Sequence, residues 1–122
     1  MKKLCEAHDV LMICDEIQTG LGRTGKLLCA QHEEVRPDMV LLGKALSGGF
    51  VPVSAVLCDN HIMKNIKPGE HGSTYGGSPL ACAVSVRALD VLLEEKMSEN
   101  SADMGEYLLN NLRRIIQSDH LT

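Results

Sequence analysis

Three short apolar runs lie in the first half of the sequence, at residues 10–14, 39–42 and 53–58. They are rich in branched aliphatic side chains and are flanked by turn-forming residues, which is typical of β-strands. The middle run, Met39 to Leu42, is apolar at every position. Strands with that pattern are buried on both faces, as in a parallel sheet. We therefore predict three strands of the parallel type.

The segments around these runs have helical patterns. Residues 1–8 resemble the last turns of an amphipathic helix, residues 27–34 predict a short helix, and residues 60–66 predict a helical turn. Ser78 is a plausible N-cap with Pro79 at the first helical position, and apolar residues then recur at helical spacing up to residue 96. A further amphipathic helix is predicted over residues 101–114. Strands and helices alternate, so the predicted fold class is α/β.

Two glycine-rich stretches are predicted to be irregular loops. Residues 15–25 contain three glycines and two threonines, and residues 67–79 contain four glycines and two prolines. Loops of that length inside a compact domain are usually functional or disordered. The second loop carries His71, Thr74 and Tyr75, which are residues that make contacts. We therefore interpret it as functional.

Composition excludes several classes of partner. The chain of 122 residues has a formal net charge of −4 and no basic run longer than a pair, which argues against nucleic acid and anionic membranes. No apolar run approaches the roughly 18 residues of a membrane span. The five cysteines are far apart and mostly lie in apolar runs. This predicts reduced, buried thiols in a reducing compartment.

Asp15 and Lys44 follow two of the predicted strands at their carboxyl ends. In open α/β sheets ligands bind in the crevice at that edge, so the two side chains would reach one site if the strands are neighbours. A solvated loop lysine and a plain ion pair are the alternatives. The glycine-rich stretches after both residues favour a ligand, because glycine allows its atoms to approach the backbone.

A lysine in front of a ligand and a carboxylate behind it is the arrangement that pyridoxal 5'-phosphate requires. The lysine binds the aldehyde of this cofactor, and the carboxylate keeps the ring nitrogen protonated. The phosphate also needs hydrogen-bond donors, and the hydroxyls of Ser73 and Thr74 could supply them. These residues make pyridoxal 5'-phosphate the candidate cofactor.

Two stretches carry a resemblance to a known family: LMICDEIQTGLGRTG at residues 11–25 and RPDMVLLGKALSGG at residues 36–49. Together with the separation of 29 positions from Asp15 to Lys44, they resemble the class III, fold type I, pyridoxal-phosphate-dependent aminotransferases. Within that family, residues 52–57 and 67–77 are more similar to the ornithine aminotransferases than to the acetylornithine or 4-aminobutyrate enzymes. The similarity covers nearly the whole chain and weakens after about residue 96.

The resemblance implies a role for each matching residue. Lys44 would hold the cofactor covalently and later move a proton between the substrate carbon and the cofactor. Asp15 would pair with the ring nitrogen, Ile17 would pack on one face of the ring, and Gln18 would hydrogen-bond the phenolic oxygen. The pair Ser73 and Thr74 would reach the phosphate of the neighbouring subunit's cofactor. Ser78 departs from the Asn that is usual after the glycine pair, which affects at most a helix cap.

The same resemblance implies the fold, the reaction and the assembly. Residues 1–96 would be the later part of the large cofactor-binding domain, an incomplete, mostly parallel sheet with flanking helices. Residues 97–122 would be the start of the small carboxyl-terminal domain. The implied reaction transfers the δ-amino group of ornithine to 2-oxoglutarate in a homodimer or larger homo-oligomer, in the mitochondrial matrix or the cytoplasm. We expect both ends of the chain to be cuts through a longer protein, which would leave the chain inactive alone.

Other candidate residues have simpler interpretations. Glu16 is interpreted as a structural carboxylate, Arg23 as a loop or interface cation rather than a substrate clamp, and His71 as a hydrogen-bonded loop residue. The remaining histidines, residues 8, 32, 61 and 120, share no spacing, so no metal site is expected. Two rival functions stay open: another class III enzyme acting on acetylornithine or an ω-amino acid, and a truncated, non-catalytic product.

Overall fold

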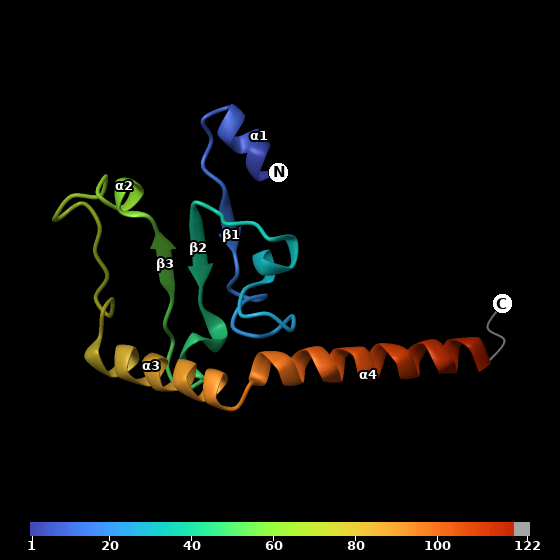
Figure 1. Cartoon of the computed structure of the whole chain (residues 1–122). Coiled ribbons are helices and arrows are strands. Elements are labelled where there is room, and N and C mark those ends of the chain that lie inside the picture. Colours follow the sequence, from blue (N-terminus) through green and yellow to red (C-terminus); the bar gives the residue numbers. More distant parts are fainter. Residues whose placement is uncertain (119–122) are drawn as a thin grey trace.

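The computed structural model describes residues 1–118, and the elements form one central sheet with helices at its ends (Figure 1). Residues 119–122 lie outside the described part, and with them His120 and the end of the predicted segment 97–122. The elements follow in the order α1 (Lys2–Ala7), β1 (Ile13–Asp15), the 3₁₀ turn η1 (Cys29–Glu33), β2 (Met39–Leu42), the 3₁₀ turn η2 (Lys44–Ser47), β3 (Ala55–Cys58), α2 (Asn60–Met63), α3 (Pro79–Glu94) and α4 (Met97–Ser118).

The sheet has the order β1-β2-β3 and is mixed. β1 pairs parallel to β2, with Asp15 opposite Leu41, and β3 pairs antiparallel to β2, with Ala55 opposite Leu42. The prediction of three parallel strands is therefore wrong for the third. A parallel connection needs a crossover, usually a helix. Residues 43–54 contain only the short turn η2, so the chain turns back beside β2.

β2 spans the predicted residues 39–42, whereas the other two strands are shorter than the apolar runs that predicted them. β2 has four residues, and the ladders on both of its sides are limited to that length, so β1 and β3 begin later than predicted. Burial of β2 on both faces was also wrong: Leu42 is 8% exposed, but the other three residues are half-buried. The reason is that α3 lies across the end of the sheet and α4 extends beyond it, so neither helix covers a face of the sheet (Figure 1).

The buried core is small and lies where β2 enters η2. Leu42 and Leu46 are its buried apolar residues, and Ser47 is fully buried beside them. The Ser47 hydroxyl donates a hydrogen bond to the Val51 carbonyl, 2.5 Å away, which closes the loop after η2. The five cysteines are free, four of them half-buried and Cys82 exposed, so the prediction of buried thiols is wrong for this chain.

The helix α3 lies across the end of the sheet where β2 ends, and α4 passes the loop after β1 and extends beyond the sheet (Figure 1). Ser78 is the N-cap of α3 and Pro79 its first residue, as predicted, although the Ser78 side chain makes no capping hydrogen bond. α4 starts four residues before the predicted helix and ends four residues after it. Lys96, with φ 50°, separates the two helices. None of the helices in residues 1–118 has the length and apolar content that crossing a membrane requires.

We expect the 122-residue chain to aggregate when it is produced alone. Among the described residues, β1 and β3 each pair on one side only, which leaves two open sheet edges. Large apolar side chains on the sheet and on α4 are at least 46% exposed: Ile13, Val56, Leu57, Met104, Leu108 and Leu112. Static light scattering of the purified chain at micromolar concentration measures this. A stable monomer would contradict the expectation.

Candidate active site

The parallel pairing of β1 and β2 places Asp15 and Lys44 at the same edge of the sheet. β1 ends at Asp15, and β2 ends at Leu42, two residues before Lys44. The hydrogen bonding between β1 and β2 continues one residue past Asp15: the Glu16 amide donates to the Leu41 carbonyl at 3.0 Å. This edge faces α3 and the start of α4 (Figure 1). The sequence placed Asp15 and Lys44 at one edge on the condition that their strands are neighbours, and β1 and β2 are neighbours.

Lys44 has an unusual backbone and a defined side-chain partner. Its φ is 45°, a left-handed conformation that costs an L-residue with a side chain roughly 1–2 kcal/mol. Such strain clusters at functional sites. The Lys44 Nζ donates to the Gln18 Oε1 at 3.0 Å. Gly43 before it lies beside Ile17, since a Cβ there would lie 3.4 Å from the Ile17 Cγ2, which is an ordinary van der Waals contact.

Lys44 and Gln18 line one cavity of about 540 Å³. Ligand-binding pockets commonly measure about 300–1,000 Å³, so the size suits a cofactor or substrate. The lining combines an amine, an amide, an apolar side chain and glycine backbone; its residues are Ile17, Gln18, Gly20, Arg23, Lys44, Ala45 and Gly49. The structure thus brings together three of the residues that the sequence selected, namely Ile17, Gln18 and Lys44. It adds Arg23, which the sequence had assigned to the loop.

Asp15 does not line that cavity. Its Oδ1 accepts a hydrogen bond from the Ile17 amide at 3.0 Å, which orients the start of the loop that carries Ile17 and Gln18. Asp15 instead lines a neighbouring cavity of about 430 Å³ together with Cys14 and Cys29. The Asp15 carboxylate is exposed and lies at the end of β1, the strand that pairs with β2, which leads to Lys44.

Ser73 and Thr74 are also outside the Lys44 cavity. Ser73 lines a separate cavity of about 370 Å³ with residues 52–54 and the beginning of α3. Its hydroxyl accepts from the Gly76 amide at 3.1 Å, which makes a local turn. Thr74 lies exposed in the same loop. In the described residues this loop therefore contributes nothing to the Lys44 cavity.

Glu16 is a structural carboxylate, as interpreted from the sequence. It is 3% exposed and accepts hydrogen bonds from the Thr19 hydroxyl at 2.6 Å and from the Cys29 and Ala30 amides at 3.0 and 2.8 Å. Burial alone would raise the pKa of the Glu16 carboxyl, but these hydrogen bonds outweigh burial and lower the pKa below its usual value. The bonds tie the loop after β1 to the start of η1.

The loop that carries Arg23 is held against the beginning of α4. The Ser101 hydroxyl donates to the Arg23 carbonyl at 3.0 Å. Gly22 and Gly25 have φ values of 87° and 90°, and a Cβ on Gly25 would lie only 2.9 Å from the Ala102 Cβ. Sequence reasoning recognised this stretch as a loop but missed its partner helix. A contact across 78 positions leaves no local signal in the sequence.

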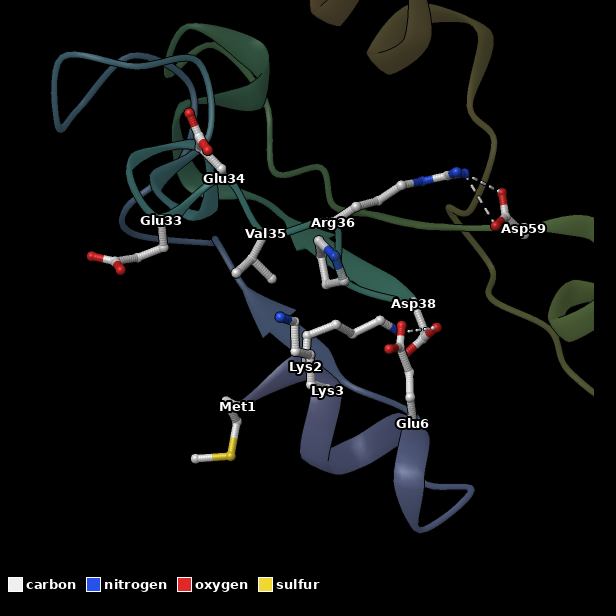
Figure 2. Close-up of a pocket in the computed structure, with 11 residues that line it drawn as sticks. Met1, Lys2, Lys3, Glu6, Glu33, Glu34, Val35, Arg36, Asp38 and Asp59 are labelled. Carbon is white, nitrogen blue, oxygen red and sulfur yellow. Dashed lines mark hydrogen bonds and ion pairs between the residues drawn. The ribbon is translucent and has the colours of Figure 1, made fainter.

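A second charged cavity lies at the opposite end of β2, and its interactions are structural (Figure 2). The Lys2 Nζ lies 2.6 Å from the Asp38 Oδ1, while the Asp38 Oδ2 accepts from the Met12 amide at 2.7 Å. The hydrogen bond between Lys2 and Asp38 raises the pKa of Lys2 and lowers that of Asp38. The Arg36 guanidinium pairs with Asp59 at 2.8 Å. These pairs tie α1 and the end of β3 to the start of β2.

The described residues contain no cluster of three or more His, Cys, Asp or Glu side chains that could hold a metal ion. The chemistry at the edge of β1 and β2 rests instead on an amine, an amide and a nearby carboxylate. A lysine in a cavity of about 540 Å³ is the kind of group that can react with a carbonyl compound.

Comparison with known proteins identifies the class. The profile of the family Aminotransferase class-III matches residues 1–122, so the chain belongs to the class III aminotransferases. Among individual proteins it is similar to a probable mitochondrial ornithine aminotransferase of Caenorhabditis elegans, with 64% identity over 92% of this chain and 26% of the relative. The chain thus spans about a quarter of the length of the curated relatives it matches.

Solved structures agree with the fold. The ornithine aminotransferase of Toxoplasma gondii ME49 superposes with a TM-score of 0.95 at 52% identity, covering 98% of this chain and 28% of that chain. Another structure of the Toxoplasma enzyme is described with partial occupancy of PLP at its active site. An acetylornithine aminotransferase of Elizabethkingia anophelis gives a TM-score of 0.92 at 55% identity, over 95% of this chain and 29% of that chain. The α/β piece is therefore part of the aminotransferase fold.

Proposed function

We propose that this chain is the segment of a pyridoxal-phosphate-dependent ornithine aminotransferase that supplies the cofactor lysine. The observation that carries the proposal is Lys44, which follows β2 at the edge shared with Asp15 and points its amine at Gln18 in a cavity of about 540 Å³. The family membership of the whole chain supports it. The same segment alone is not expected to catalyse the reaction, because about three-quarters of the length of its relatives has no counterpart here.

The residues present fit pyridoxal 5'-phosphate in chemical type. When it is bound, this cofactor supplies an aldehyde that a lysine can hold and a ring that accepts electrons from the substrate. Lys44 would hold it through Nζ and would also move the proton at the reacting carbon. A free amine is needed for both tasks, and Gln18 offers the amine an uncharged acceptor instead of a carboxylate.

Three neighbouring residues would complete the hold on the ring. Asp15 would pair with the ring nitrogen from the end of the adjacent strand, Ile17 would pack on one ring face, and Gln18 would bond the phenolic oxygen. Asp15 and Ile17 are already linked by a hydrogen bond of 3.0 Å. That link supports a common orientation of the acid and the apolar side chain.

The loop with Ser73 and Thr74 is proposed to bind the cofactor phosphate of a second subunit. Its support is that Ser73 faces a different cavity from Lys44. Two exposed hydroxyls in an open loop with no role in their own subunit's cavity suit a partner's ligand. The proposed assembly is therefore a homodimer, or a larger oligomer built from dimers.

The proposed substrates are ornithine and 2-oxoglutarate, with glutamate semialdehyde and glutamate as products. The worm and Toxoplasma relatives are ornithine aminotransferases, which supports ornithine. The worm relative is mitochondrial, which supports the mitochondrion over the cytoplasm. An acetylornithine aminotransferase is the second candidate, because the Elizabethkingia structure is as similar in sequence as the Toxoplasma structure.

A donor assay on the whole protein that carries this segment tests the proposal. With 2-oxoglutarate as acceptor, we expect kcat/KM for ornithine to exceed that for N-acetylornithine and 4-aminobutyrate by about 10⁴-fold, the discrimination that a site built around a substrate's polar group provides. A preference for N-acetylornithine would favour the second candidate. Absence of activity with all donors would contradict both.

Variants of the segment can be studied in a carrier enzyme. We use this term for a complete enzyme that contains residues 1–122, either the natural protein or a chimaera in which they replace the matching segment of the Toxoplasma gondii enzyme. The chain superposes on that enzyme over 98% of its length with a TM-score of 0.95, so the boundaries of the exchange can be matched. The carrier enzyme supplies the substrate-binding surroundings, while the cofactor lysine comes from this chain.

A further inference from the structure

We propose that Arg23 is an anion-binding residue of the Lys44 cavity, which receives a carboxylate of the substrate or the phosphate of the cofactor. The inference rests on the proposed function and adds a group that the sequence had assigned to the loop or to an interface. The chemistry shared by both ligands is a planar or tetrahedral group of anionic oxygens. Three observations carry the proposal.

The first observation is the charge balance of the cavity. Arg23 and Lys44 both line it, and no carboxylate is among the described residues that do. Of the nearest acids in the sequence, Asp15 lines the neighbouring cavity and is the proposed partner of the cofactor's ring nitrogen, and Glu16 is buried with three hydrogen-bond donors of its own. Two cations without a counter-charge make the cavity attractive to an anion.

The second observation is that the Arg23 guanidinium has no protein partner. In the described residues its side chain makes no hydrogen bond and no ion pair, whereas Arg36 and Arg87 pair with carboxylates. Lys44, the other cation of the cavity, donates to Gln18. The guanidinium is thus the cation of this cavity that remains available for a ligand.

The third observation is that the backbone of the Arg23 loop is fixed. The Ser101 hydroxyl of α4 donates to the Arg23 carbonyl, and Gly22 and Gly25 lie against Ser98 and Ala102. A solvated surface cation needs no such support. A ligand-binding arginine does, because its binding energy falls when the side chain starts from a mobile backbone.

Arginine also has the geometry that the proposed ligands require. Its planar guanidinium forms two parallel hydrogen bonds with a carboxylate or a phosphate, which lysine cannot do. The two cations of the cavity would then divide their roles. Lys44 would hold the reacting carbonyl carbon, and Arg23 would bind an anionic end of the same molecule or of its reaction partner.

The test compares three variants of the carrier enzyme: Arg23→Gln, Arg23→Lys and, as a matched control, Lys26→Gln. Lys26 is an exposed cation of the same loop that does not line the cavity. One arm measures KM and kcat for ornithine and for 2-oxoglutarate. The other arm measures the Kd of the apoenzyme for pyridoxal 5'-phosphate and for pyridoxal, which lacks the phosphate.

We expect Arg23→Gln to weaken one of these ligands by about 10- to 100-fold, the usual effect of a lost charge-assisted hydrogen bond. If the anion is a substrate carboxylate, KM rises by that factor, more than kcat falls, and the Kd for the cofactor is unchanged. If the anion is the phosphate, the Kd for pyridoxal 5'-phosphate rises while that for pyridoxal does not. Arg23→Lys should lie between wild type and Arg23→Gln, and Lys26→Gln should match wild type.

The proposal is overturned if every constant of Arg23→Gln stays within twofold of wild type. It is also overturned if the variant only dissociates the dimer, which sedimentation velocity measures, because Arg23 would then be an interface cation. Borohydride labelling separates this outcome from failure of the proposed function. If Lys44 of the wild-type carrier is labelled and the constants of Arg23→Gln are unchanged, the role of Arg23 is rejected while the proposed function stands.

Discussion

Replacing Lys44 by alanine should lower kcat of the carrier enzyme by on the order of 10⁴-fold, the upper end of what one positioned acid–base group contributes. The substitution removes the amine that would hold the cofactor and move the proton. It should not unfold the protein, because the Lys44 side chain is exposed and makes a single hydrogen bond, to Gln18. Alanine at this position keeps the same left-handed backbone cost.

The measurement has two parts. Steady-state kinetics give the loss of kcat, and Lys26→Ala serves as the control for removal of a lysine from the neighbouring loop. Borohydride reduction in the presence of pyridoxal 5'-phosphate, followed by peptide mapping, then identifies the lysine that binds the cofactor. Wild type should carry the label on Lys44, and Lys44→Ala should carry none. A label on another lysine of the wild-type carrier would show that Lys44 is not the cofactor lysine.

Replacing Glu16 by alanine should reduce the stability of the carrier enzyme by about 3 kcal/mol. The buried carboxylate accepts three hydrogen bonds, and each donor left unsatisfied costs about 1–3 kcal/mol, with the lower figure for donors that water can reach. Glu16→Gln should cost less, because it keeps the shape and one acceptor oxygen. Urea unfolding at neutral pH gives the loss. Glu33→Ala, which removes an exposed carboxylate from η1, should lie within about 0.5 kcal/mol of wild type.

The pH dependence of this effect follows from the lowered pKa of Glu16. A carboxyl whose pKa is lower in the folded than in the unfolded protein stabilises the fold above the unfolded value, which is about 4.5. That contribution disappears as the pH falls from 4.5 through the folded pKa. The difference in unfolding free energy between wild type and Glu16→Gln should therefore shrink in acid. A difference that stays constant down to pH 3, about 1.5 units below that value, would contradict a lowered pKa in the folded state.

The local parts of the site could be predicted from the sequence. An apolar run ending two residues before Lys44, and another ending just before Asp15, were enough to place both residues at strand ends. Glycine and threonine content identified the loops. These features depend on a few consecutive residues, whose periodicity and turn chemistry are visible in the sequence itself.

The parts that depend on distant contacts could not be predicted. The direction of β3 depends on how residues 43–54 turn, and the separation of Asp15 from the Lys44 cavity depends on how the loop after β1 folds back on Glu16. The availability of Arg23 appears only when α4 is placed beside its loop. The burial of β2 was overestimated for the same reason, because an apolar strand is buried only where other parts of the protein cover its faces.

The close packing of Gly25 against Ala102 constrains how this sequence can vary. The two positions lie 77 residues apart in the sequence. A side chain at position 25 would clash with the Ala102 Cβ, and only glycine at position 102 would remove that atom. Variation at position 25 is therefore limited by residue 102 and by the φ of 90°. In a deep mutational scan of the carrier enzyme, position 25 should tolerate little beyond glycine, whereas the exposed position 102 should tolerate more substitutions.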